Sequence, residues 1–106
     1  MIRVKVPNVI RLGIYKYRIK FDHAMLITNG NVGEHRPSTG VIALDPHMSA
    51  PSQTQCLNHE VLHHICNQYK LGLGEDDIDR LATGWAEYME RGLGIQYDWS
   101  GIRGEK

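Results

Sequence analysis

The sequence predicts an α+β domain in which a small antiparallel sheet of three to four strands precedes a hairpin of two helices. Apolar residues alternate with polar ones in the first half of the chain, and they recur every three to four residues in the second half. A chain of 106 residues has room for one hydrophobic core. We therefore expect a single domain over 1–106, with strands and loops in 1–48, two helices in 49–92 and a tail in 93–106.

The clearest strand signal lies at residues 15–21, where apolar and charged side chains alternate as in a strand with one exposed face. The preceding segment is rich in Val, Ile and Tyr and is interrupted at Pro7-Asn8 and Gly13. These features favour short strands on both sides of the interruptions.

Two further short apolar runs, 24–28 and 41–44, complete the expected sheet. The first run ends at Asn29-Gly30-Asn31, which is a turn signal. Residues 29–40 contain three glycines and predict a loop.

In the second half of the chain, apolar residues recur with the period of an α-helix. Ser49 or Ser52 can cap a helix whose first turn accepts Pro51. Apolar residues at an i, i+4 spacing predict that this helix runs from about 51 to 70; they are Leu57, Val61 and Ile65.

A second helix is predicted after the break Leu71-Gly72-Leu73-Gly74, whose glycines suit the left-handed conformation at a helix end. Three acids then favour the positive end of the helix dipole: Glu75, Asp76 and Asp77. The predicted apolar stripe is Ile78, Leu81, Ala82, Trp85 and Met89. Gly92 and Gly94 end the helix, and the tail is expected to pack on the core.

Positive and negative charges balance, with twelve Lys and Arg against twelve Asp and Glu. The basic residues are concentrated in 1–20 and the acidic residues in 75–90. Such a chain lacks the broad basic field that gives non-specific affinity for nucleic acid, so we expect no nucleic-acid partner. A basic patch formed by the N-terminal strands is the alternative.

Composition also predicts a compartment. No apolar run reaches the ~18–20 residues of a membrane span, and no signal-peptide core follows Met1, so we expect no membrane partner. Two cysteines without an export signal predict a reducing, cytoplasmic setting with thiols rather than a disulfide.

The first predicted helix contains His59-Glu60-Val61-Leu62-His63, an H-E-x-x-H pattern. Residues i and i+4 share one helix face, so the two imidazoles can bind one Zn²⁺. Glu60 lies about 100° around the helix from His59, where it can act as general base on a zinc-activated water without being a ligand. The motif predicts a zinc cofactor, with a structural histidine pair as the alternative.

A catalytic zinc requires a third protein ligand and one open position. On the second helix, Glu75 and Asp79 lie one turn apart on the same flank of the apolar stripe. If the chain reverses near Leu73, Asp79 is nearer to the level of His63. We therefore predict Asp79 as the third ligand and Glu75 as the second candidate. Thr83, one turn later, can hydrogen-bond a ligand histidine.

Cys56 and Cys66 fall on the same side of the first helix as the two histidines. They are about 15 Å apart along the helix axis, so one zinc with bonds of ~2.0–2.3 Å cannot collect both cysteines and both histidines. We expect buried thiols.

For other polar residues the sequence suggests a functional role less specifically. His64 is rotated about 100° from His63 and is expected to contact the sheet or solvent, and His23 has no predicted role. The strand 41–44, as an exposed edge, could hold an extended peptide. Five residues could stabilise an oxyanion, and the sequence does not choose among them: His35, His47, Tyr15, Tyr17 and Tyr88.

The predicted sheet includes Ile42-Ala43-Leu44-Asp45, and two helical segments follow it: Leu57-Asn58-His59-Glu60-Val61-Leu62-His63-His64, then Ile78-Asp79-Arg80-Leu81-Ala82-Thr83-Gly84-Trp85. Over about residues 15–90 the chain resembles small phage and prophage proteins that look like reduced zincins and are similar to ImmA/IrrE-type metallopeptidases. The resemblance implies a zincin-like fold, zinc on His59 and His63, and Glu60 as base. It also implies an acidic third ligand on the following helix, in the place that Asp79 occupies, where gluzincins commonly have glutamate.

The expected function is that of a minimal zinc-dependent metallopeptidase, which hydrolyses a peptide bond in a protein or peptide substrate. If the chain is phage-encoded, it acts in the cytoplasm of the bacterial host. ImmA/IrrE-type proteins typically act on DNA-binding repressors and often carry a helix-turn-helix module, which this chain lacks. The alternative is a non-catalytic, zincin-like binding or regulatory protein.

Overall fold

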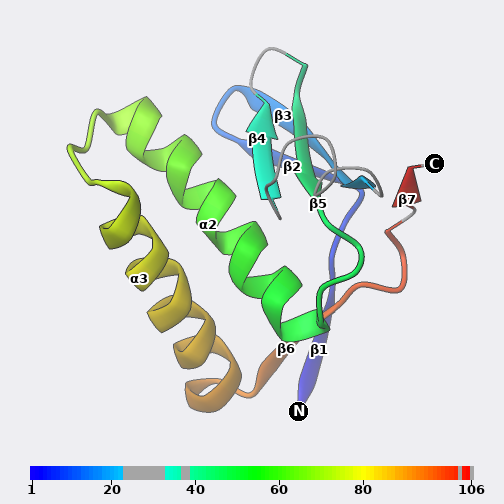
Figure 1. The fold of residues 1–106 in the computed structure, drawn as a ribbon. Helices are drawn as coiled ribbons and strands as arrows, with labels where there is room; N and C mark the ends of the chain where they lie inside the picture. Colours follow the sequence, from blue (N-terminus) through cyan, green and yellow to red (C-terminus); the bar gives the residue numbers. More distant parts are fainter. Residues whose placement is uncertain (23–32, 37–38, 103, 106) are drawn as a thin grey trace.

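The computed structural model describes residues 1–22, 33–36, 39–102 and 104–105. Its helices lie on one side of a sheet, so the predicted α+β class is confirmed. Figure 1 shows the arrangement: α2 lies between α3 and the sheet. The long central helix therefore has one face toward the strands and another toward its helical neighbour.

The main sheet has the strand order β2-β3-β5-β4, and β7 pairs with the far end of β3. The bounds of its strands are β2 Val9–Leu12, β3 Tyr15–Asp22, β4 Gly33–Arg36, β5 Val41–Leu44 and β7 Gly104–Glu105. The pair β2–β3 is antiparallel, as expected, and β4–β5 is antiparallel too, but β3 and β5 pair in parallel. The sheet is therefore mixed. Side-chain alternation identifies a strand without specifying the direction of its neighbour.

Two strand expectations need correction. The glycine-rich segment expected to be a loop contains β4, whose Gly33 pairs with Leu44. The segment 41–44, expected to be an exposed edge, is the interior strand β5 between β3 and β4, and β4 forms the edge among the described strands. The predicted strand 24–28, its turn signal and His23 lie outside the described residues.

A second, two-stranded sheet joins the two ends of the described chain. Strand β1 (Ile2–Lys5) pairs in parallel with β6 (Ile95–Asp98), with Ile2 opposite Ile95. The tail was expected to pack on the core, and Trp99 and Ile102 are indeed buried there.

Helix α2 spans Ala50–Tyr69, within one residue of its predicted bounds. Ser49 is its N-cap and accepts a hydrogen bond from the backbone N–H of Ser52. At the other end, Lys70 adopts the left-handed conformation that was expected of a glycine, and its N–H donates to the carbonyl of Cys66. Gly74 has extended backbone and begins the next helix.

Helix α3 spans Glu75–Glu87 and continues into the π-helical turn η1, Tyr88–Gly92. All three acids of its predicted first turn lie there. Of its predicted apolar stripe, Ile78 and Ala82 are buried, whereas Leu81 is 49% and Trp85 55% exposed. Because α3 packs on α2 and not on the sheet, only a narrow part of the stripe is covered.

The core lies between the sheet and α2. Ile42 and Leu44 of β5, Tyr17 and Ile19 of β3 and Leu57 of α2 are buried together there. This packing fixes the rotation of α2, and the rotation in turn decides which side chains face α3.

Candidate metal centre

The two histidines of the H-E-x-x-H motif meet as their spacing predicts. The Nε2 atoms of His59 and His63 are 3.0 Å apart on α2. Their side chains are 13% and 27% exposed, so both rings are held by packing while one side stays open to solvent.

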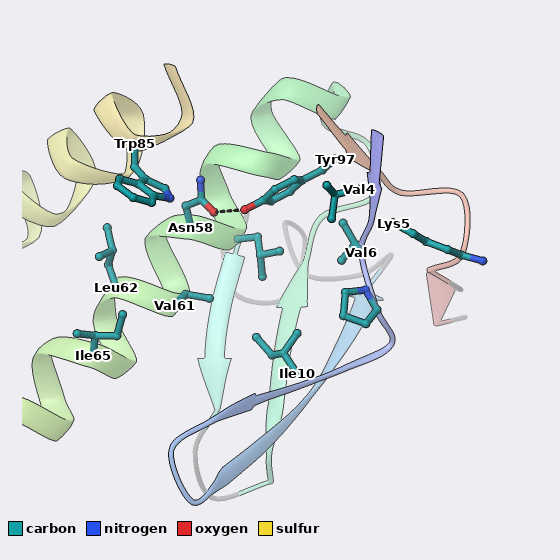
Figure 2. A pocket seen from close by; sticks show the side chains of 12 residues that line it. Val4, Lys5, Val6, Ile10, Asn58, Val61, Leu62, Ile65, Trp85 and Tyr97 are labelled. Atoms are coloured by element: carbon teal, nitrogen blue, oxygen red, sulfur yellow. Dashed lines mark hydrogen bonds between the residues drawn. The ribbon is translucent and has the colours of Figure 1, made fainter. Parts of the chain in front are cut away.

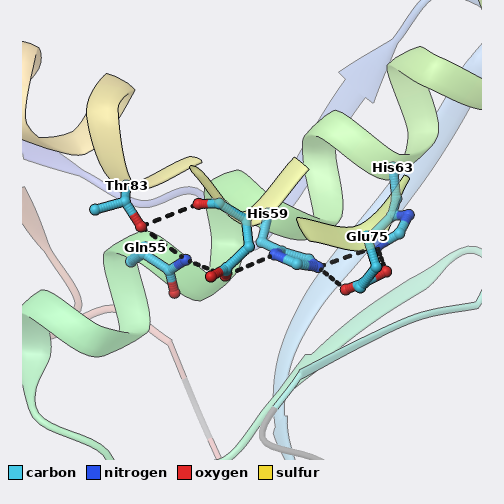
Figure 3. Close-up of polar contacts among 6 residues, drawn as sticks. Gln55, His59, His63, Glu75 and Thr83 are labelled. Carbon is cyan, nitrogen blue, oxygen red and sulfur yellow. Dashed lines mark hydrogen bonds and ion pairs between the residues drawn. The ribbon is translucent and has the colours of Figure 1, made fainter. Parts of the chain in front are cut away.

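Glu75 completes a three-residue group with these histidines. One carboxylate oxygen is 2.6 Å from Nε2 of His59, and the other is 2.9 Å from Nε2 of His63. These ligand atoms all lie within 4.8 Å of one another, as in a metal-binding set. Figure 3 shows the carboxylate of Glu75 facing both rings.

Asp79, the residue that the sequence favours as third ligand, contacts the other side of His59. Its Oδ1 is 3.3 Å from Nδ1 of His59, and the same oxygen accepts a hydrogen bond of 2.9 Å from Nε2 of Gln55. Thr83, expected to bond a ligand histidine, donates instead to the backbone carbonyl of Asp79. Asp79 and Glu75 thus contact different nitrogens of one imidazole.

The position of the helical turn explains why the second candidate, Glu75, faces the Nε2 pair. The sequence expectation placed the reversal near Leu73. In the structure α2 ends within one residue of its predicted bound, and α3 begins at Glu75, whose carboxylate contacts His63. The level of His63 on α3 is thus occupied by the first residue of that helix and not by a residue one or two turns later.

Glu60 is 8% exposed and lines a cleft of about 210 Å³ together with His59, Glu75 and Asp79. Gly33 of β4 lines the same cleft. A Cβ atom at Gly33 would lie 3.4 Å from Oε2 of Glu60 and only 2.4 Å from Sγ of Cys56. The edge strand thus approaches α2 closely beside the glutamate, because position 33 has no side chain.

Both cysteines are free and buried, as expected. Burial, followed by the nearby carboxylates of Glu60, Asp79 and Asp45, raises the pKa of the Cys56 thiol to about 12. Cys56 lines the cleft, but at neutral pH it is a neutral thiol rather than the thiolate that metals prefer.

Two further histidines, His64 and His47, have partners away from the cleft. His64 is buried, and its Nδ1 is 2.8 Å from the hydroxyl of Tyr17, which confirms a contact with the sheet. His47 is 69% exposed, and its Nδ1 is 2.8 Å from a carboxylate oxygen of Asp45. Four of the oxyanion candidates are absent from the described lining of the cleft: Tyr15, Tyr17, His47 and Tyr88. Of His35 the structure gives the backbone position, in β4 opposite Ile42.

Sequence reasoning missed two residues of this region, Gln55 and Gly33. Gln55 lies one turn before His59, so the i, i+4 rule that identified the histidines could also have identified it. Gly33 had no comparable signal, because its importance depends on which strand lies against α2.

The fold and the site together have the form of a small α+β domain with a candidate metal centre on its central helix. The chain matches no protein-family model, no curated protein and no solved structure. In the described part of the chain, no helix is long and apolar enough to cross a membrane.

Proposed function

We propose that this chain is a zinc-dependent peptide hydrolase in which His59, His63 and Glu75 bind the metal and Glu60 is the general base. The observation that carries the proposal is the convergence of three ligand atoms, two Nε2 and one carboxylate oxygen, within 4.8 Å. The resemblance to ImmA/IrrE-type metallopeptidases is part of the same proposal.

The donor set suits zinc, which takes imidazole nitrogen and carboxylate oxygen at ~2.0–2.2 Å. In a tetrahedral site such bonds separate neighbouring ligand atoms by roughly 3.3 Å. The distances of 2.6 to 3.0 Å between the three groups are slightly shorter. Outward movements of about 0.3–0.7 Å make room for the ion. Glu75, which is 66% exposed, can move, and the two imidazoles separate slightly.

Asp79 acts in this proposal by orienting His59. Its Oδ1 forms an ion pair with Nδ1 at 3.3 Å. A carboxylate beside Nδ1 favours the proton on that nitrogen, so Nε2, which faces His63 and Glu75, keeps the free lone pair. Gln55 donates to the same Asp79 oxygen and so holds the carboxylate beside the ring.

Glu60 is the group that moves the proton. It takes a proton from the attacking water and later delivers it to the leaving amine. When bound, zinc supplies a Lewis acid that lowers the pKa of that water to ~7 and polarises the peptide carbonyl. An extended peptide would bind along β4, the edge strand beside Glu60, through main-chain hydrogen bonds.

Metal binding is tested by isothermal titration with zinc of the wild type and of single variants. We expect one zinc per chain, a loss of binding in His59→Ala and Glu75→Gln, and a 10- to 100-fold loss of affinity in Asp79→Asn. His47→Ala and Asp76→Asn are matched controls, because both remove an exposed residue of the same type outside the cluster. If His59→Ala binds zinc as the wild type does, the site is wrong.

Catalysis is tested with fluorescently labelled β-casein, an unstructured protein substrate. We expect zinc-loaded wild type to cleave it and Glu60→Gln to keep zinc while losing activity by a factor of about 10²–10⁴. Cleavage that survives in Glu60→Gln would contradict the mechanism. Tight zinc binding with no cleavage by the wild type would favour the non-catalytic binding protein.

A further inference from the structure

A second and larger pocket lies on the other flank of α2. Its volume is about 500 Å³, and it shares no lining residue with the metal cleft in the described part of the chain. Figure 2 shows it between α2, α3 and the segment that joins β1 to β2. Most of its wall is apolar, including Val6, Ile10 and Val61. Lys5 also borders it, but its side chain extends away from the pocket in Figure 2.

Asn58 is the polar side chain that lies within this apolar wall. The residue is 7% exposed, and its Oδ1 accepts a hydrogen bond of 3.0 Å from the hydroxyl of Tyr97. Its Nδ2 is buried and has no hydrogen-bond partner among the described residues. A buried N–H donor without an acceptor is rare in folded proteins, because it has lost its bonds to water and gained none.

Trp85 cannot supply the missing acceptor. Figure 2 shows its indole nitrogen pointing toward Asn58. An indole N–H and an amide NH₂ are both donors, so neither satisfies the other. This end of the pocket therefore presents N–H groups that an acceptor oxygen would complete.

We propose that this pocket binds an uncharged, mostly apolar small molecule whose carbonyl oxygen accepts a hydrogen bond from Nδ2 of Asn58. The volume lies within the usual range of small-molecule sites, which are apolar cavities with a few well-placed polar groups. Because Nδ2 is buried, the acceptor has to enter the pocket rather than lie across its mouth. This requirement favours an inserted ligand over a flat protein surface.

The test uses prodan, an uncharged fluorescent naphthalene with one propionyl carbonyl, and the matched naphthalene that lacks this group. We expect prodan to bind saturably at one site per chain. Asn58→Leu should weaken prodan three- to tenfold, as expected for one hydrogen bond, and leave the carbonyl-free probe unchanged. Equal weakening of both probes would overturn the role of the amide.

Two further variants locate the site and remain informative if Asn58→Leu folds poorly. Trp85→Ala and Leu81→Ala remove side chains of similar exposure, 55% and 49%, from the same helix, but only Trp85 lines the pocket. We expect Trp85→Ala to weaken prodan binding and Leu81→Ala to leave it unchanged. Identical effects would overturn the location.

The variant His59→Ala tests whether the pocket binds its ligand independently of the metal centre, and prodan binding should persist in it.

Sedimentation velocity over a wide range of protein concentrations tests the other occupant, a second copy of the chain. We expect the sedimentation coefficient not to change with concentration. Dimers that prodan dissociates would overturn the proposal in favour of a self-association surface.

Discussion

Cys56 combines a reactive atom with surroundings that suppress its reactivity. It lies against β4 and near three carboxylates, and its pKa of about 12 keeps it protonated. In a Cys66→Ala background, we expect iodoacetamide at pH 8 to label the native protein about a thousandfold more slowly than the denatured one, since only the thiolate reacts. The measurement is the mass of the labelled protein against time. Equal rates would show that the thiol is neither buried nor raised in pKa.

Asp98 makes the stability of the fold depend on pH in the acidic range. Its Oδ1 accepts a hydrogen bond of 3.0 Å from the backbone N–H of Ser100. The pKa of the Asp98 carboxyl is held below its usual 3.8. The hydrogen bond from the backbone of Ser100 contributes most, followed by the one from its side chain and then by the charges of Arg3 and Lys5. A lowered folded-state pKa contributes stability above the unfolded value and loses it as the pH falls through the folded value.

We therefore expect the wild type to lose more stability than Asp98→Asn when the pH is lowered from 5 to values below 3.8. Urea unfolding midpoints at both pH values measure this difference. Ser100→Ala keeps the backbone donor and removes the hydroxyl, so its loss should be intermediate. Parallel curves for wild type and Asp98→Asn would contradict the assignment.

At the scale of secondary-structure elements, the contact between β4 and α2 depends on Gly33. A Cβ there would lie 2.4 Å from Sγ of Cys56, so Gly33→Ala has to displace the Cys56 side chain, the strand or the helix. We expect a loss of about 1–3 kcal/mol in the free energy of unfolding, as for other overpacked sites. Chemical denaturation measures it.

A double-variant cycle isolates the cause of that loss. Cys56→Ala removes the clashing sulfur, so the cost of Gly33→Ala should be smaller in this background than in the wild type. Gly72→Ala is the matched control, because nothing lies within 4 Å of its added Cβ. An unchanged cost in the Cys56→Ala background would mean that the sulfur is not the obstacle.

The helices were predictable from sequence because their signals are local. Ser49, the i, i+4 apolar spacing and the acidic first turn of α3 all act within a few residues. The pair His59 and His63 was predictable for the same reason, since one helix positions both. The parallel pairing of β3 with β5 was not, because nothing in either strand specifies its partner.

The third member of the candidate site shows where local reasoning ends. Choosing between Glu75 and Asp79 requires the register of two packed helices, and an error of one turn exchanges them. That register depends on the end of α2 at Tyr69 and on the left-handed Lys70, which took the conformation expected of a glycine. The end of α2 was predicted to within one residue, so the packing of the two helices against each other supplies what the sequence left open.

At the scale of the whole molecule, Trp99 joins elements that are far apart in the sequence. It is 9% exposed and packs near Phe21 and Tyr97, with ring centroids 5.9 and 6.2 Å away. Its indole N–H donates to Thr54 at 3.2 Å. One side chain thus contacts the main sheet, the second sheet and α2.

We expect Trp99→Ala to cost about 3–5 kcal/mol, a large share of the ~5–15 kcal/mol that stabilises a typical domain. Trp85→Ala, at an exposed position, should cost less than about 1 kcal/mol. Guanidinium unfolding followed by circular dichroism compares the two. Equal costs would contradict the central position of Trp99.

The pairing of β1 with β6 has a consequence for biosynthesis. Ile2 lies opposite Ile95, so β1 must wait while the residues up to its partner strand β6 are translated, roughly 5–20 s at the usual rate of synthesis. Until then its apolar residues Ile2 and Val4 have no strand to pair with. The two-stranded sheet can form only after β6 has been synthesised, and until then β1 is an unpaired segment that chaperones can bind.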